Sequence, residues 1–230
     1  MNRPEPFTLT VDDDPTVSAL WLQPPGPRCT YAFAHGAGAG MQHAFMEALS
    51  QALFDQSVAT LRYQFPYMER GSKRPDAPAL AQATVRAAVA AARDRLPGAP
   101  LFAGGKSFGG RMTSQAQATA PMPGVRGLVF VGFPLHPAGK PGIERAGHLA
   151  DVKVPMLFLQ GTRDELADLA LLRGVVQGLG NKATLHLEDD ADHAFHVRAR
   201  SGRSDAQVVQ ALAEAIAAWT QVQAPDARRE

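Results

Sequence analysis

Short apolar runs alternate with longer mixed runs along most of the chain. Apolar runs of about four to eight residues between turn-forming residues are typical of strands, and longer runs are typical of helices. On this pattern, strands are predicted over residues 7–11, 16–22, 30–34, 57–62, 100–104, 125–131, 154–160 and 184–187. Helices are predicted over residues 41–56, 79–96, 111–120, 165–178 and 205–222.

This alternation of strands and helices predicts an α/β fold, with a mostly parallel sheet covered by helices on both faces. The first two strands are joined by the turn-rich run Asp-Asp-Asp-Pro, so we expect them to form an antiparallel edge. No repeat or linker divides the chain. We therefore expect a single domain over residues 1–230, with frayed ends at 1–6 and 224–230. Active sites in such sheets lie at the carboxyl ends of the strands.

A glycine-flanked serine follows the strand predicted over 100–104. Residues 105–109 read Gly-Lys-Ser-Phe-Gly, and a helix is expected directly after them. In a sharp turn between a strand and a helix, glycines leave room for the crossing backbones, and the serine hydroxyl is held above the sheet. The amino end of the helix also favours negative charge at this point. Ser107 is therefore predicted to be a nucleophile.

Two glycine-rich segments, at 105–109 and 36–40, each resemble a nucleotide-binding motif, and neither fits that motif. A phosphate-binding loop requires a glycine five residues before Gly105, where Pro100 stands. The glycines of the loop 36–40 are one residue short of the dinucleotide-binding spacing, and the next strand ends without an acidic residue for the ribose. For the five residues around Ser107 taken alone, a glycine-rich turn with an incidental serine is the alternative.

A serine nucleophile requires a base, and the base requires an acid that orients it. His193, in the loop after the last predicted strand, is the predicted base, with His196 as the alternative. Asp164, after the preceding strand, is the predicted acid, and Asp168 is the second choice. A helix N-cap is the alternative role of Asp164. Three other histidines, His43, His148 and His186, are expected to be surface or core residues without a catalytic role.

Acyl transfer also requires hydrogen-bond donors for the developing oxyanion. The backbone N–H of Phe108, directly after the serine, is predicted to be one donor. The loop after the strand 30–34 is rich in glycine and alanine, which lets its backbone approach a substrate, and Ala37 is predicted to supply the second N–H.

Two further loops are expected to surround the site. They follow the strands 57–62 and 125–131 and carry aromatic residues and prolines. Arg62, Tyr63 and His136 are predicted to contact the substrate, and loop packing without substrate contact is the alternative.

Composition and charge narrow the functional classes. The net charge is +1 without a basic stripe, which argues against nucleic-acid binding. No stretch approaches the ~18 apolar residues required to span a bilayer, so a cytoplasmic protein without membrane partners is expected. Cys29, the one cysteine, is expected to be a small buried residue. The cluster of His and Asp around 186–196 lacks the spacing of metal ligands, so no metal and no cofactor are predicted.

The motifs together indicate a family. They are His-Gly-Ala-Gly-Ala-Gly at 35–40, Arg-Tyr-Gln-Phe-Pro-Tyr at 62–67, Gly-Lys-Ser-Phe-Gly-Gly-Arg at 105–111, Phe-Pro-Leu-His-Pro at 133–137 with Lys-Pro at 140–141, and Asp-His at 192–193. With these motifs the chain resembles the α/β-hydrolase superfamily. It is similar to the small dienelactone-hydrolase-like members, and more closely to bacterial relatives of testis-expressed protein 30 and of the lysine-acetyltransferase regulatory complex subunit 3.

The resemblance implies the sheet, a Ser-Asp-His triad and the absence of a large cap domain. Dienelactone hydrolases use a cysteine nucleophile, and Ser107 departs from them. The prediction is a serine hydrolase that acts on a small ester, thioester or similar acyl compound without a cofactor. The alternatives are a non-catalytic interaction module of the same fold, and a peptidase or acyltransferase that uses the same triad. The sequence leaves the oligomeric state open.

Overall fold

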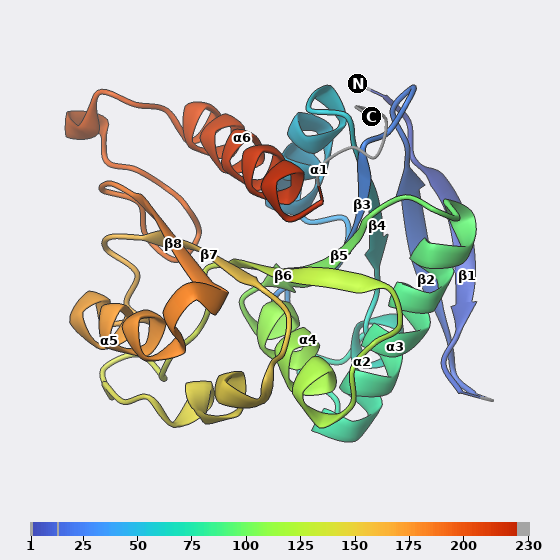
Figure 1. Cartoon of the computed structure of the whole chain (residues 1–230), viewed down its shortest axis with the longest axis horizontal. Coiled ribbons are helices and arrows are strands. Elements are labelled where there is room, and N and C mark those ends of the chain that lie inside the picture. The colour runs from blue at the N-terminus through green and yellow to red at the C-terminus, as the bar shows by residue number, and fades with distance from the viewer. Residues whose placement is uncertain (1, 13, 225–230) are drawn as a thin grey trace.

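The computed structural model describes residues 2–12 and 14–224, and a twisted sheet crosses the molecule from edge to edge (Figure 1). The eight strands follow the spatial order β1-β2-β4-β3-β5-β6-β7-β8. They are β1 (Glu5–Thr10), β2 (Thr16–Leu22), β3 (Cys29–Ala34), β4 (Val58–Tyr63), β5 (Leu101–Lys106), β6 (Val125–Val131), β7 (Met156–Gly161) and β8 (Ala183–Glu188). Strands β3 to β8 are parallel, while β2 is antiparallel to β1 and to β4. The predicted fold class and antiparallel edge are confirmed.

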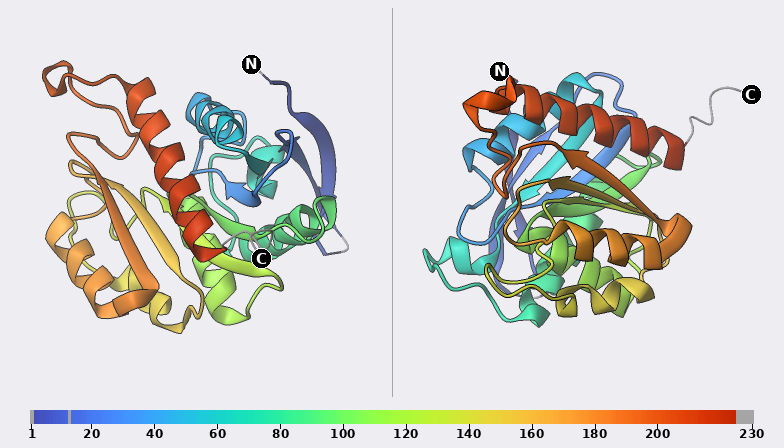
Figure 2. Two further views of the ribbon diagram at one scale, coloured as in Figure 1. Left: turned by 45° about the horizontal axis from the view of Figure 1, so that its top comes forward. Right: turned by 90° about the vertical axis from the view of Figure 1, so that its left-hand side faces the viewer.

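Helices cover both faces of the sheet (Figure 2). The α-helices are α1 (Ala44–Asp55), α2 (Pro66–Glu69), α3 (Pro78–Arg95), α4 (Phe108–Thr119), α5 (Leu169–Leu179) and α6 (Asp205–Gln223). Three short 3₁₀ helices are η1 (Glu144–Asp151), η2 (Gly180–Lys182) and η3 (Ala199–Ser201). Helices α1 and α6 pack on one face, and α3, α4 and α5 pack on the other. None of the helices described has the length and apolarity needed to cross a membrane.

The central strands are apolar on both faces, as a sheet covered on both sides requires. Strands β3, β4, β5 and β7 are buried along their whole length. Tyr31 and Phe33 belong to the core beneath α1 and α6. Phe130 and Phe158 belong to the opposite core, where their rings meet edge to face with centroids 4.8 Å apart. Each face thus has its own apolar core, and the sheet is held between two layers of helices.

The element boundaries differ from the predictions at a few points. Residues 5 and 6, expected to be frayed, pair with β2 because β1 begins at Glu5. Ala224 is buried, and the rest of the expected frayed C-terminal end, residues 225–230, lies outside the described residues. The predicted loop after β4 contains the short helix α2, which begins at Pro66. Proline is suited to the first position of a helix, because its missing N–H would have no partner there.

Candidate active site

Ser107 occupies the turn between β5 and α4. Its backbone has φ 50° and ψ −114°, a positive φ that is rare for any residue with a side chain. Strand β5 runs two residues further than predicted, to Lys106, and the Ser107 N–H donates to the Val131 carbonyl at 3.1 Å. The serine therefore stands at the end of β5 in the strained turn that the sequence predicts.

The two glycines that flank the serine are required by the close approach of the end of β3. A Cβ atom on Gly105 would lie 2.5 Å from the Ala34 carbonyl oxygen. A Cβ atom on Gly109 would lie 2.6 Å from the carbonyl oxygen of His35. Both distances are below any normal contact, so only glycine fits the two positions without moving the backbone.

His193 and Asp164 lie beside Ser107 and form a chain of hydrogen bonds with it. His193 Nε2 is 2.9 Å from Ser107 Oγ, and His193 Nδ1 is 2.7 Å from Asp164 Oδ2. Since a carboxylate only accepts hydrogen bonds, it holds the imidazole with the proton on Nδ1 and leaves Nε2 free to accept from the serine. The Asp164 side chain is fully buried, whereas the His193 side chain is 27% exposed.

Asp164 is held by its own loop. Its Oδ1 accepts from the Leu166 N–H at 2.8 Å, and its Oδ2 also accepts from the side-chain amide of Gln160. Asp168, the second choice for the acid, instead caps α5 by accepting from the Leu171 N–H at 3.0 Å. The helix expected to begin at 165 begins at Leu169 for this reason, and the N-cap role considered for Asp164 belongs to Asp168.

The other histidines have other partners. His196, the alternative base, pairs with the exposed Asp205 at 2.9 Å, and this carboxylate raises the pKa of His196. His43 caps α1 by accepting from the Phe45 N–H. His148 lies 2.7 Å from the Ser114 hydroxyl, and His186 lies 2.9 Å from Glu188.

The loop after β3 carries the predicted oxyanion donor Ala37. Within the described residues, the N–H groups of Ala37 and Phe108 donate to no other group. His35 lies beneath this loop: its Nδ1 donates to the Gly36 carbonyl at 2.7 Å, and its Nε2 accepts from the Phe65 N–H at 3.1 Å. Burial lowers the pKa of His35 to about 4, so the ring is neutral at pH 7. Because a peptide group is planar, fixing the Gly36 carbonyl also fixes the direction of the Ala37 N–H.

Further hydrogen bonds hold this loop to the segment after β4. The Gly38 N–H donates to the Tyr67 hydroxyl at 3.1 Å, and the Met41 N–H donates to Gln64 Oε1 at 2.9 Å. The Arg62 guanidinium donates to the Met41 carbonyl at 2.9 Å. Sequence reasoning did not identify Gln64 and Tyr67 as supports of the loop, because their partners are backbone groups that are distant in sequence.

The three predicted substrate contacts lie inside the protein. Arg62, Tyr63 and His136 are 2%, 1% and 3% exposed. His136 Nδ1 donates to the Pro137 carbonyl at 2.9 Å, and its Nε2 accepts from the Asp168 N–H at 2.8 Å. These contacts favour the alternative of loop packing, in which Arg62 and His136 hold the loops around the serine.

Cys29 is buried beside Thr220, as expected, and burial raises the pKa of its thiol to about 11. A thiol is reactive as its thiolate, so Cys29 is unreactive at neutral pH. Over residues 2–12 and 14–224, no group of three or more His, Cys, Asp or Glu side chains is placed to hold a metal ion.

Comparison with known proteins places the chain in a family. The sequence profile of the alpha/beta hydrolase domain matches residues 27–221, which is most of the chain. The match includes Ser107, Asp164 and His193, together with the loop that carries Ala37.

Solved structures share the fold. An α/β serine hydrolase without a lid from Xanthomonas campestris is 21% identical, with a TM-score of 0.73 and coverage of 95% of this chain and 96% of that chain. A dienelactone hydrolase from Anabaena variabilis is 18% identical, with a TM-score of 0.74 and coverage of 96% and 98%. Est1E from Butyrivibrio proteoclasticus, solved with ferulic acid bound, is 14% identical, with a TM-score of 0.76 and coverage of 96% and 100%.

Proposed function

The chain belongs to the alpha/beta hydrolase domain family, and from this premise we propose that it is a serine hydrolase that cleaves esters or thioesters of small acyl compounds. The observation that supports the proposal is the pair of hydrogen bonds from Asp164 through His193 to Ser107, at 2.7 and 2.9 Å. A serine hydroxyl becomes nucleophilic when a correctly oriented base accepts its proton, and these two hydrogen bonds supply that orientation.

In the acylation step, Ser107 Oγ attacks the carbonyl carbon of the substrate as its proton moves to His193 Nε2. The carbonyl oxygen becomes an oxyanion, which accepts from the N–H groups of Ala37 and Phe108. When the carbonyl re-forms, the bond to the leaving group breaks, and His193 gives the proton to the departing alcohol or thiol. The product of this step is an acyl ester on Ser107.

In the deacylation step, water replaces the alcohol. His193 Nε2 takes a proton from the water as its oxygen attacks the acyl carbon, and a second oxyanion forms in the same place. Collapse of this intermediate breaks the bond to Ser107 Oγ and releases the acid, and the proton on His193 returns to the serine. The cycle requires no cofactor.

Each group contributes a different part of the rate. Proton transfer by a positioned base is worth about 10²–10⁴-fold. One oxyanion donor is worth about 10²–10³-fold. Asp164 acts through His193: its buried carboxylate stabilises the imidazolium that forms in both steps. Its hydrogen bonds from Leu166 and Gln160 prevent it from turning toward solvent.

The surroundings of the serine support this substrate class. Phe108, directly after Ser107, is partly exposed, and its ring packs edge to face against the buried Phe65 and Tyr67, with ring centres 5.3 and 6.3 Å away, so an apolar side chain adjoins the nucleophile. The connection from β6 to β7 contains only the short helix η1 as regular structure, which leaves no cap domain over the site. An open site with an apolar wall suits a small acyl group. The ferulic acid bound by Est1E, a fold relative, is a compound of that size.

The closer resemblance, to bacterial relatives of testis-expressed protein 30, stays a prediction. It rests on the motifs at 35–40, 62–67, 105–111, 133–137, 140–141 and 192–193 together. The proposal of an ester substrate does not depend on it.

A fluorophosphonate probe tests the proposed function. The probe phosphonylates an activated serine, so mass mapping of the treated protein is expected to find one adduct, on Ser107. The Ser107→Ala variant is expected to lose both the adduct and the turnover of p-nitrophenyl acetate. Ser114→Ala serves as the matched control, because Ser114 lies in α4, the helix that follows Ser107, and bonds His148 instead. A folded protein that takes up no probe would contradict the proposal.

A further inference from the structure

Lys106, the residue before the nucleophile, takes no part in the steps above. Its side chain is 9% exposed, although lysine is among the residues least often buried. The ammonium lies 5.9 Å from the centre of the Phe45 ring and 5.3 Å from that of Phe195. These two rings stack on each other at 5.6 Å, so the lysine ends against an aromatic pair formed by α1 and the loop after β8.

The ammonium of Lys106 donates a hydrogen bond to the backbone carbonyl of His193. Among the described residues, that carbonyl accepts from no other group. Other groups hold the neighbouring residues of the loop: the Asp192 N–H donates to the His196 carbonyl at 3.0 Å, and the Ala191 carbonyl accepts from the Arg163 N–H at 2.9 Å. Lys106 therefore joins the backbone of His193 itself to β5, the strand that precedes the nucleophile.

The structure makes room for this side chain. Gly132, at the end of β6, has φ 69°, and a Cβ atom there would lie 3.0 Å from Lys106 Nζ. A Cβ atom on Gly36 would lie 3.5 Å from Lys106 Cγ. A methionine would fill the same volume without bringing a charge into the interior. Packing alone therefore does not explain why a charged lysine stands at position 106.

Burial disfavours the charged form of Lys106, and the surrounding carboxylates offset this effect in part. Burial lowers the pKa of Lys106 to about 8, and the carboxylates of Asp164 and Asp192 act in the opposite direction. With His193, they are the titratable groups that face the ammonium, from the loops after β7 and β8. Strongly shifted groups of this kind gather at functional sites.

We propose that Lys106 is a positioning residue, whose ammonium holds the His193 backbone so that the imidazole stays in line between Asp164 and Ser107. This role rests on the proposed function, because it concerns the base of that reaction. An ammonium is a stronger donor than a neutral amine, so the role also requires the protonated form. Deprotonation of Lys106 weakens its hydrogen bond to the His193 backbone, so the imidazole is held less firmly. No group that touches the substrate is removed.

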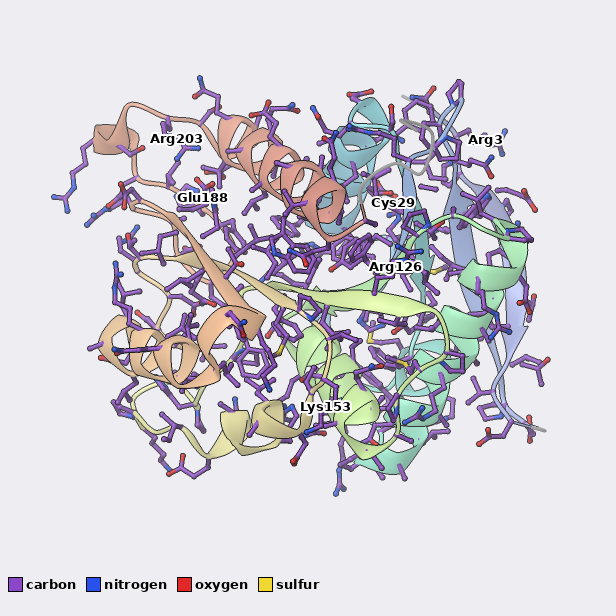
Figure 3. All side chains as sticks on the ribbon, viewed as in Figure 1. Arg3, Cys29, Arg126, Lys153, Glu188 and Arg203 are labelled. Carbon is purple, nitrogen blue, oxygen red and sulfur yellow. The ribbon has the colours of Figure 1, made fainter. Side chains whose placement is uncertain are left out.

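The test compares Lys106→Met with Lys153→Met. Lys153 is exposed and lies shortly before β7 (Figure 3). Because the serine follows the other, carboxyl end of its strand, the Lys153 variant controls for the loss of one positive charge away from the site. We expect Lys106→Met to lower kcat about tenfold to a hundredfold, since misplacement of a catalytic group by about 1 Å costs on that order. KM is expected to change less than about threefold, because the substrate-facing groups are intact. A kcat within about twofold of that of Lys153→Met would overturn the proposal.

The pH profile separates positioning from a merely structural role. In the unmodified protein, kcat is expected to decline as the pH rises through about 8, where Lys106 loses its proton. Lys106→Arg stays protonated and is expected to retain its activity to higher pH, and Lys106→Met is expected to show a low, flat profile over this range. An alkaline decline that is the same in all three proteins would contradict the role of the ammonium.

Two further measurements, a thermal melt and hydrogen exchange, keep the proposal testable if a variant does not fold or if the protein is not a hydrolase. If Lys106→Met does not fold, as judged by its thermal melt, the wild-type and Lys106→Arg profiles alone decide. Hydrogen exchange over residues 190–197 is expected to quicken in Lys106→Met even without a substrate. If the fluorophosphonate does not label Ser107 while this exchange still quickens, the proposed function fails and the contact from Lys106 to the loop stands. Unchanged exchange in a folded variant would overturn the positioning role itself.

Discussion

The seven histidines of the chain differ in what their ring nitrogens contact, and the contacts decide what each can do. Only His193 has a carboxylate on one nitrogen and the Ser107 hydroxyl on the other, among the described residues. His35 and His136 each hold two backbone groups, which locks the ring in place and leaves no nitrogen for chemistry. His196 stands three residues from His193 in a similar acidic run, yet its partner is Asp205. Proximity in sequence therefore says little about the role of a histidine.

The comparison of His193 with His196 gives a prediction at this scale. His193→Ala is expected to lower kcat for p-nitrophenyl acetate about a thousandfold or more, because the serine loses its base. His196→Ala removes an exposed pair with Asp205 and is expected to leave kcat within about threefold. Steady-state kinetics of the two variants at pH 7.5 checks this. The reverse order of effects would transfer the role of the base to His196.

At the scale of elements, the loop after β3 and the segment after β4 behave as one unit. The loop is rich in glycine and alanine and has few side chains to fix its own shape. Arg62 at the end of β4 and Gln64 and Tyr67 in the segment after it provide that shape. His35 bonds both the loop and the segment. Tyr67, which is buried, therefore supports the loop through its hydroxyl.

Removal of one support gives the prediction at this scale. Tyr67→Phe leaves the ring in place and removes the hydroxyl that accepts from the Gly38 N–H. One hydrogen bond is worth about 1 kcal/mol, so we expect kcat to fall by up to about tenfold, with KM changed less than twofold. Tyr31→Phe is the matched control: its hydroxyl bonds the Val129 carbonyl inside the core, and its loss is expected to lower stability but not kcat. Equal kinetic effects of the two variants would show that the loop does not depend on Tyr67.

At the scale of the whole molecule, the parallel sheet brings distant segments to one edge. Ser107 follows β5, Asp164 follows β7, His193 follows β8 and Ala37 follows β3, so the site consists of the carboxyl ends of these strands. The two cores on either face hold the strands in register, and they hold the site with them. The packing that stabilises the sheet therefore also keeps the residues of the site in place.

The stability of the whole molecule is expected to depend on pH. Burial lowers the pKa of both His35 and His148 to about 4, below the 6.5 of a free histidine. The unfolded chain therefore binds more protons than the folded protein between these values, and stability present above pH 6.5 is lost as the pH falls toward 4. For the fully buried His35 the expected loss is about 3 kcal/mol. The half-buried His148 is expected to contribute less.

Urea unfolding at pH 7, 6, 5 and 4.5 checks this expectation. The free energy of unfolding is expected to decline with each step. His148→Gln retains an amide that can bond Ser114 and cannot take up the proton, so its decline is expected to be shallower than that of the unmodified protein. Identical declines in the two proteins would show that His148 makes no contribution to the pH dependence.

The sequence by itself determined the secondary-structure elements and the candidate residues of the triad. The period of apolar residues predicts every strand and each long helix within a few residues, because these patterns are local and match the burial of a covered sheet. The sequence also identified Ser107, Asp164 and His193, which the structure brings within hydrogen-bond distance of one another. The glycine motif and the place of each residue after a strand were sufficient for this, since parallel strands end at the same edge.

Only the tertiary structure decided which way the loop side chains turn. Asp164 faces the site while Asp168 caps a helix, and Arg62 and His136 point into the protein rather than toward a substrate. The contact of Lys106 with the His193 carbonyl joins residues 87 positions apart. These directions depend on hydrogen bonds to backbone groups that are far away in sequence, and no local pattern of residues records where such groups will lie.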